Sequence, residues 1–372
     1  MAAMARTLAR RHEVTVLSSR AAGLPPEESD GGVHVVRVPV LFRKQLAVAN
    51  FASMATYLPT ASWRGLRLGR SAGFDVINTH FVVPTGPVGA WLARQLKVPN
   101  VLSVHGGDLY DPSKSSSPHR HALLRWSVRH LLCRADVVVA QSRDTARNVA
   151  ALYGVKRPVE LVPLGIDRPP IAPRGERREF DIPENAYVLI TVGRIVARKA
   201  SLQLVETLCA VREAVLLVVG DGPEAAALMS RATDRGVAER VRMLGHVSEA
   251  SKQRALRVAD VFVSTSQHEG FGLVYLEAMA FGLPIVCYDR GGQTDFLSTP
   301  ATGYVVALND LDAFNTAVAS LRDSPQLRAA IARHNLAAVE EFFIERCAER
   351  YEQLFVDVLA RSARLAGPRV AV

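Results

Sequence analysis

Cysteine is scarce in this chain, and long apolar runs are absent. Four cysteines, Cys133, Cys209, Cys287 and Cys347, lie far apart in 372 residues. Their spacing fits no metal site, so we expect buried, reduced thiols in a reducing compartment. No apolar run approaches the roughly 20 residues that span a bilayer, and no signal peptide is visible. We therefore expect a cytoplasmic protein, with the inner face of the membrane as a candidate peripheral partner.

The positive charge of the chain is concentrated in its first half. Residues 1–180 hold 25 Lys and Arg against 13 Asp and Glu, a net +12, whereas residues 181–372 hold 20 against 23, a net −3. A basic half can meet an anionic membrane or acceptor, and Phe42-Arg43-Lys44 and the stretch from Trp63 to Arg70 mix aromatics with cations. The alternative is an ordinary solvated surface. Nucleic acid is not expected as a partner, because no binding motif accompanies the charge.

Short apolar strands alternate with helical patterns from end to end, which predicts open parallel sheets covered by helices. Two sets of strands are expected on either side of a Pro- and Gly-rich linker at 169–183. The first set is 14–17, 33–38, 75–78, 100–104, 137–140 and 159–162. The second set is 187–192, 214–219, 241–244, 261–264, 285–288 and 303–306. Ligands of such sheets bind at the carboxyl ends of the strands.

The most informative stretch is QHEGFGLVYLEAMAFGLPIVCYDRGGQTD, from Gln267 to Asp295. A glycine turn leads into a helix predicted from Leu273 to Phe281, which Gly-Leu-Pro ends. Glu269 therefore precedes a helix N-terminus, and Glu277 lies about a turn and a half inside the helix. Free backbone amides and the helix dipole favour an anion at such a place. The pattern suits a diphosphate with a polyol on each side.

With these motifs the chain resembles a retaining glycosyltransferase of family four with the GT-B fold. The E-x7-E stretch carries the resemblance, and VGRIVARK (192–199), VVGDGPE (218–224), VPLGID (162–167) and SVHGGD (103–108) support it in the same order. The resemblance implies two Rossmann-like α/β domains with parallel sheets that face a central cleft. It places an acceptor-binding domain at 1–168 and a nucleotide-sugar-binding domain at 184–340. A terminal helix, 341–372, is expected to cross back to the first domain.

The resemblance also implies an activity, the transfer of a hexose from a UDP-, GDP- or ADP-sugar with retention of configuration. The acceptor would be a saccharide, a lipid-linked saccharide or a small molecule. Asp108-Leu109-Tyr110-Asp111 is not the D-x-D of metal-dependent transferases, and no His, Cys and carboxylate cluster indicates a metal. We expect neither a metal nor another cofactor.

Site residues follow by resemblance. The residues expected to act in catalysis are His105, Arg194, Lys199 and Glu269. The residues expected to bind the donor are Gly193, Arg194, Lys199, Gly270, Phe271, Gly272, Leu273 and Glu277. Asp108 and Asp111 are expected to contact the acceptor, although Asp111-Pro112 also suits a turn.

Two alternatives remain open. The family begins with a strand and a glycine-rich loop, whereas Met1 to Val14 opens within a helix, so the first strand is expected to be missing. This motivates an inactive or weakly active partner subunit. The second alternative is a nicotinamide dehydrogenase, because Gly220 to Ala225 fits G-x-G-x-x-A. Pro223 and the lack of a following acidic residue count against it, and we interpret this segment as a turn beside the donor site.

Overall fold

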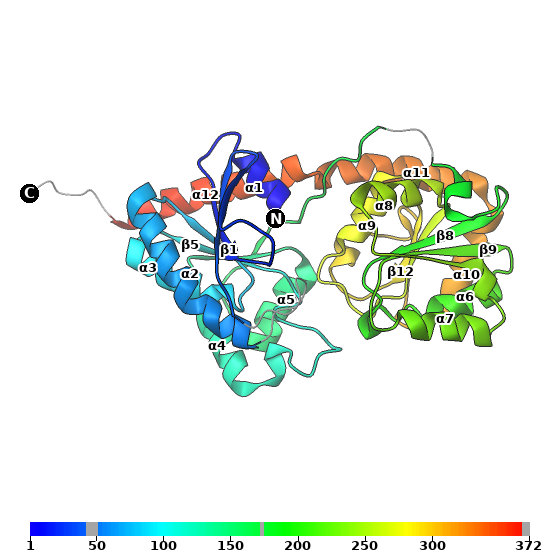
Figure 1. The fold of residues 1–372 in the computed structure, drawn as a ribbon, viewed down its shortest axis with the longest axis horizontal. Coiled ribbons are helices and arrows are strands. Elements are labelled where there is room, and N and C mark those ends of the chain that lie inside the picture. The colour runs from blue at the N-terminus through cyan, green and yellow to red at the C-terminus, as the bar shows by residue number, and fades with distance from the viewer. Residues whose placement is uncertain (42–50, 172–174, 367–372) are drawn as a thin grey trace, which may run out of the picture. The chain divides into compact units, whose positions relative to one another are not determined.

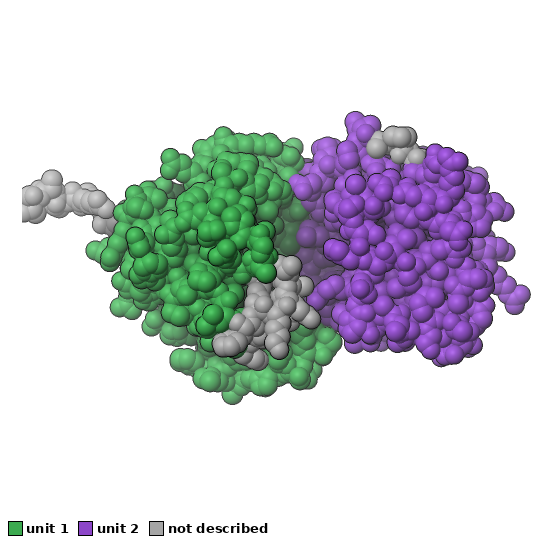
Figure 2. All heavy atoms as spheres, viewed as in Figure 1, with its two compact units in different colours: residues 1–165, 344–372 green, residues 166–343 purple. Residues whose placement is uncertain are grey.

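The chain folds into two α/β units (Figure 2). The structure is a computed structural model that describes residues 1–41, 51–171 and 175–366. Unit 1 comprises Met1–Gly165 and Ile344–Val372, and unit 2 comprises Ile166–Phe343. The predicted α/β class with parallel sheets is confirmed in both units.

Unit 2 contains one six-stranded sheet, and all of its strand pairs are parallel. The strands are β8 (Tyr187–Val192), β9 (Ala214–Val219), β10 (Val241–Gly245), β11 (Val261–Ser264), β12 (Ile285–Tyr288) and β13 (Gly303–Val306). Their order is β10-β9-β8-β11-β12-β13. The chain thus adds β9 and β10 on one side of β8, and then adds β11, β12 and β13 on the other side.

Helices cover both faces of this sheet (Figure 1). The helices are α6 (Gln203–Ala210), α7 (Ala225–Asp234), α8 (Glu249–Val258), α9 (Leu273–Ala280), α10 (Leu311–Asp323) and α11 (Pro325–Ala338). One layer holds α6, α7 and α10, and the other holds α8, α9 and α11. Strands β9 and β11 are buried throughout, as expected of apolar runs in a sheet covered on both faces.

The described strands of unit 1 form two sheets. They are β1 (Thr15–Ser19), β2 (Glu27–Asp30), β3 (Val33–Val38), β4 (Ile77–His80), β5 (Asn100–Val104), β6 (Val137–Ala140) and β7 (Glu160–Leu161). The orders are β1-β3-β2 and β4-β5-β6-β7, so β1 and β4 each pair with one described strand. Strand β2 is antiparallel to β3, and its EESD sequence has no apolar signal from which it could have been predicted.

Helices also surround the strands of unit 1. They are α1 (Ala2–Leu8), α2 (Phe51–Ala72), α3 (Thr85–Leu96), α4 (Ala122–Arg134), α5 (Arg143–Tyr153) and α12 (Ile344–Ala366). The apolar face of α12, including Tyr351 and Leu354, packs with Leu8 of α1 and with Val101 and Val139 of the sheet. None of the helices in the described ranges is long and apolar enough to cross a bilayer.

Candidate functional site

The site of unit 2 lies where the strand order of its sheet reverses. Strand β8 pairs with β9 on one side and with β11 on the other, and Phe262 of β11 lies beside Ile190 of β8. The connections that leave β8 and β11 therefore start side by side at the carboxyl edge of the sheet. Such a reversal point is where open α/β sheets bind ligands. The β8 connection carries Gly193 to Lys199, and the β11 connection carries Glu269.

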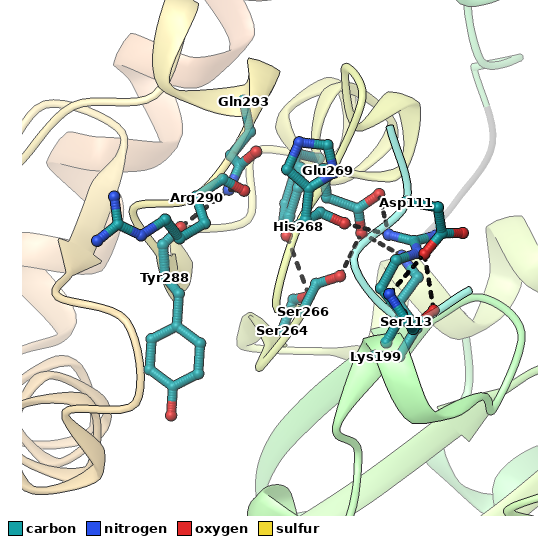
Figure 3. A network of polar contacts seen from close by, with 12 residues as sticks. Asp111, Ser113, Lys199, Ser264, Ser266, His268, Glu269, Tyr288, Arg290 and Gln293 are labelled. Carbon is teal, nitrogen blue, oxygen red and sulfur yellow. Dashed lines mark hydrogen bonds and ion pairs between the residues drawn. The ribbon is translucent and has the colours of Figure 1, made fainter. Parts of the chain in front are cut away.

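Lys199 and Glu269 meet at this point (Figure 3). The Lys199 ammonium forms an ion pair with Oε1 of Glu269, and the Ser266 hydroxyl donates to the same oxygen at 2.7 Å. The Arg198 guanidinium lies 3.3 Å from Oε2 of Glu269 and also donates to the His268 carbonyl. Two cations and one buried carboxylate thus form a compact cluster with a net positive charge.

The ionised state of Glu269 is stabilised by this cluster. Burial by itself would raise the pKa of the carboxyl group, but the charges of Lys199 and Arg198 outweigh it and hold the pKa below its usual value. The Glu269 side chain is only 9% exposed. A buried carboxylate of this kind must be paired, and its two cationic partners come from a loop about 70 residues earlier in the chain.

Glycines allow the backbone segments around this cluster to approach closely. A Cβ atom at Gly220 would lie 2.0 Å from the carbonyl oxygen of Gly193, and one at Gly222 would lie 2.2 Å from that of Ile195. Gly220 also has φ +138°, which favours glycine. These two glycines therefore bring the β9 connection against the β8 connection. This supports the interpretation of the segment as a turn beside the site and gives its glycines a packing role.

The predicted donor-binding residues around the β8 connection are placed differently. Gly193 lies beside Lys199, since a Cβ atom at Gly193 would be 3.7 Å from the Lys199 ammonium. Arg194 follows Gly193 and is exposed. The structure therefore brings Gly193, Lys199 and Glu269 together, and it leaves Arg194 at the surface of the same loop.

The glycine turn enters helix α9 as the sequence predicts. Gly272 is the N-cap of α9 and has φ +95°, where a Cβ atom would lie 2.5 Å from the Tyr275 ring. Phe271 is buried against Phe296, whereas Leu273 is exposed. The first amides of a helix have no intrahelical partners. The start of α9 thus offers donors within a few residues of the Lys199–Glu269 pair.

Glu277 is already paired in α9. Its Oε2 lies 2.9 Å from the ammonium of Lys252 on α8, and the same ammonium lies 2.9 Å from Glu249. Burial raises the pKa of Glu277, and the positive charge of Lys252 opposes this. Lys252 is 16% exposed and Glu249 is 67% exposed, so the Lys252–Glu277 contact is the more buried of the two.

The predicted residues of unit 1 lie at the carboxyl ends of β4 and β5. His105 follows β5, and its Nε2 lies 3.0 Å from Nδ1 of His80, the last residue of β4. Asp108 accepts hydrogen bonds from the backbone N–H groups of Val82 and His105, at 2.7 and 2.9 Å. Burial raises the Asp108 pKa in spite of these bonds.

Asp111 also bonds within its own loop. It accepts from the backbone and hydroxyl of Ser113, and Lys114 lies 3.3 Å away. Burial would raise the Asp111 pKa, but these partners lower it overall. Asp108 and Asp111 thus both hold loop backbone in this structure. Their contact with an acceptor stays a prediction.

Besides Arg198, which adjoins Lys199 and contacts Glu269, sequence reasoning missed three residues that contact the predicted site. Ser266 precedes Glu269 by three positions, Lys252 lies on the preceding helix, and His80 ends β4. Of these three, only His80 has a signal in the sequence, because it is a polar residue two positions after the predicted strand 75–78. The other two contacts depend on tertiary packing.

Comparisons with known proteins agree on one family. Residues 174–336 match the family model described as Glycosyl transferases group 1, and residues 1–168 match that of Glycosyltransferase Family 4. The chain is 30% identical over 344 residues to the GDP-mannose-dependent alpha-(1-6)-phosphatidylinositol monomannoside mannosyltransferase of Mycolicibacterium smegmatis, with 87% of this chain and 85% of the relative covered. It is 27% identical to the N-acetyl-alpha-D-glucosaminyl L-malate synthase of Bacillus anthracis, with 77% and 75% covered.

Solved structures show the same fold. A sucrose-phosphate synthase from Thermosynechococcus elongatus superposes with a TM-score of 0.81 at 20% identity, covering 96% of this chain and 92% of that one. Anabaena HepE in complex with UDP and glucose superposes with a TM-score of 0.72 at 18% identity, covering 95% and 94%. The expected GT-B fold is thereby confirmed. These comparisons give no support to an inactive partner subunit.

Proposed function

This chain belongs to the group 1 glycosyl transferases of family four, and on that premise we propose that it transfers a hexose with retention of configuration and without a metal. It is a glycosyltransferase that depends on a nucleotide sugar. The proposal for the mechanism depends chiefly on the Lys199–Glu269–Arg198 cluster at the reversal point of the unit 2 sheet. This cluster places fixed cations beside the N-terminus of α9.

Lys199, with Arg194 on the same loop, binds the donor diphosphate and stabilises the charge that grows on it as the sugar leaves. A fixed donor at a developing oxyanion typically contributes about 3–4 kcal/mol to lowering the barrier. The amides from Gly270 to Leu273 add neutral donors at the α9 N-terminus, where the helix dipole favours an anion. Protein cations and amides thus supply the charge stabilisation that a metal supplies in other enzymes.

Glu269 and Glu277 take different roles in this proposal. The Glu269 carboxylate already accepts from Lys199, Arg198 and Ser266. Its first role is therefore to hold the Lys199 ammonium in place. A sugar hydroxyl that donates to the Glu269 carboxylate shares an oxygen with these donors. Glu277 is paired with the partly buried ammonium of Lys252, so lone pairs remain for the ribose hydroxyls of the nucleotide.

His105 of unit 1 is proposed to contact the sugar and the diphosphate as a neutral imidazole. Burial lowers the pKa of His105 to about 4, so the ring carries no charge at neutral pH. The proton of the acceptor hydroxyl then passes to the leaving phosphate oxygen, while the new glycosidic bond forms on the same face of the sugar. Asp108 and Asp111 hold the backbone of the loop beside His105. We propose that they contact the acceptor from this loop.

The donor and the acceptor are proposed only as classes. The relatives named above use GDP-mannose and act on phosphatidylinositol monomannoside, or join N-acetylglucosamine to L-malate. We accordingly propose a UDP-, GDP- or ADP-hexose as donor and a saccharide, lipid-linked or small-molecule acceptor.

A panel of nucleotide sugars tests this function. A ligand that binds only the native state raises the Tm, so one nucleotide sugar should raise the Tm and be turned over. Turnover that persists in EDTA and an NMR spectrum of an α-linked product from an α-linked donor are the expected results. A β-linked product would overturn retention, and loss of turnover in EDTA that Mg²⁺ restores would overturn metal independence.

Contact with an anionic membrane is proposed for helix α2. Trp63, Arg67 and Arg70 are exposed on one side of α2, and the Arg67 guanidinium lies 4.8 Å from the centre of the Trp63 ring. A cationic face with an exposed aromatic suits the headgroup region. Phe42-Arg43-Lys44 lies outside the described residues. Co-sedimentation with anionic but not zwitterionic vesicles at low salt, reduced by Trp63→Ala, is expected; no binding to either would overturn the proposal.

A further inference from the structure

A chain of polar side chains connects helix α12 with His105 inside unit 1. The Tyr351 hydroxyl donates to Oγ of Ser103 at 3.1 Å, and Ser103 donates to Oδ1 of Asn78 at 2.9 Å. Nδ2 of Asn78 lies 3.0 Å from Nε2 of His80. Nδ1 of His80 lies 3.0 Å from Nε2 of His105. Four consecutive contacts therefore join the α12 hydroxyl to the imidazole of His105.

The direction of these hydrogen bonds is set at the Tyr351 end. The Tyr351 hydroxyl is buried, and in the described part of the chain its proton is accepted by Ser103. Ser103 then uses its own single proton for Oδ1 of Asn78, which turns the Asn78 amide N–H toward His80. The opposite amide orientation would leave Ser103 with two donors directed at it and no acceptor for its proton.

The direction then fixes the position of the proton on each imidazole. Nε2 of His80 accepts from Asn78, so the one proton of neutral His80 is on Nδ1 and is donated to Nε2 of His105. The proton of neutral His105 is therefore on its Nδ1. A neutral imidazole has one N–H donor and one acceptor nitrogen, and the acceptor nitrogen of His105 is already used by His80.

Both rings are neutral at physiological pH. Burial lowers the pKa of His80 to about 3, with smaller contributions from His105 and the amino group of the chain. Burial also lowers the pKa of His105 to about 4, and the Gln141 side-chain amide donates to the backbone carbonyl of His105 at 2.6 Å. The His105 ring is further held by stacking on Phe81, with 4.3 Å between ring centres.

We propose that His80 is a positioning residue that holds His105 as its Nδ1–H tautomer, so that His105 donates a hydrogen bond to the substrate and cannot accept a proton from it. Only one part of this inference, the role of His105 in catalysis, rests on the proposed function. The position of the proton itself depends on the contacts inside unit 1. It gives a structural reason why His105 is no general base.

Long-range ¹⁵N–¹H NMR of the ¹⁵N-histidine-labelled protein at pH 7 reads the tautomers directly. We expect His80 and His105 to show a protonated Nδ1 and an unprotonated Nε2, with assignments from His80→Gln and His105→Gln. Removal of the Asn78 amide by Asn78→Leu should release both tautomers. Tyr351→Phe removes the donor that sets the direction at Ser103, so it should also allow the second tautomer of each ring to appear. A wild-type His105 protonated at Nε2 overturns the inference.

Kinetics test the positioning role. His80→Phe removes the donor to His105 and should lower kcat about tenfold with little change in the donor KM, whereas His80→Gln, whose amide can donate to Nε2, should recover most of the loss. Thermal unfolding of each variant monitors the fold. An unchanged kcat in His80→Phe overturns the positioning role. If no nucleotide sugar is turned over by the wild-type protein but the NMR result stands, the tautomer assignment is supported and the proposed function fails.

Discussion

The ammonium of Lys252 on α8 lies 2.9 Å from the carboxylate of Glu277 on α9. The second acid of the E-x7-E motif is thus oriented by a residue that the motif does not contain. Because burial disfavours the ionised form of Glu277 and Lys252 opposes this effect, the cation also keeps the carboxylate available as an acceptor. This relationship leads to the first prediction.

Replacement of Lys252 by Met should weaken nucleotide binding through Glu277. We expect the Kd of the nucleoside diphosphate that the donor panel identifies to rise about tenfold, or about 1.4 kcal/mol, with kcat little changed. In a Glu277→Gln background the same replacement should have a much smaller effect, because interacting residues are not additive. Isothermal titration calorimetry measures the Kd for the wild type, the two single variants and the double variant. Glu249→Gln is the matched control, since Glu249 shares the ammonium but is exposed; strict additivity would contradict the prediction.

Replacement of Lys199 by Met should depress kcat by about 10²–10³-fold, since one fixed donor at the leaving phosphate is lost. Lys199→Arg keeps the charge and should retain much more activity. Steady-state kinetics with the donor identified by the panel provide the measurement, and thermal unfolding separates the chemical effect from lost stability. A Lys199→Met enzyme with full kcat would show that the phosphate clamp is assigned to the wrong residue.

The stability that Glu269 contributes should depend on pH. Its pKa in the folded protein is lowered from 4.5 by Lys199 and Arg198, in spite of burial. The contribution is therefore fully present above pH 4.5 and is lost as the pH falls through the lower folded value. Glu269→Gln should cost about 3 kcal/mol at pH 7, and the difference from wild type should shrink below pH 4.5 in urea unfolding.

The control for this measurement is Glu345→Gln, which removes an exposed acid and should show no such pH dependence. A Glu269→Gln deficit that stays constant from pH 7 to pH 3.5 would mean that the carboxylate is not stabilised by its cations.

Replacement of Gly220 by Ala should destabilise unit 2. The new Cβ atom would meet the Gly193 carbonyl at 2.0 Å, and φ +138° disfavours any side chain. Overpacking of this kind typically costs about 1–3 kcal/mol, and the shift of the β8 connection should also weaken nucleotide binding. Gly107→Ala is the control, because its new Cβ atom would meet no heavy atom within 4 Å. Equal unfolding free energies for the two variants would refute the close approach.

Much of the fold could be predicted because each parallel strand is a short apolar run. The predicted strands 33–38, 100–104, 137–140, 187–192, 214–219, 261–264, 285–288 and 303–306 agree with the structure to the residue. The helix predicted from Leu273 to Phe281 ends one residue earlier, at Ala280. Strand β2 could not be predicted, because Glu27–Asp30 is a polar edge strand held by its pairing with β3 and by no apolar pattern of its own.

The candidate site also has one part that could be predicted from the sequence and one part that could not. The sequence alone determined the glycine turn, the placement of Glu269 before a helix and the lysine after β8, because turn chemistry and burial leave local patterns. Only the tertiary structure decided that Lys199 pairs with Glu269, that Lys252 holds Glu277 and that Tyr351 connects through Ser103 to the histidines. Tyr351 and Ser103 are 248 residues apart, and contacts at such separations follow from strand order and helix packing, which no local pattern encodes.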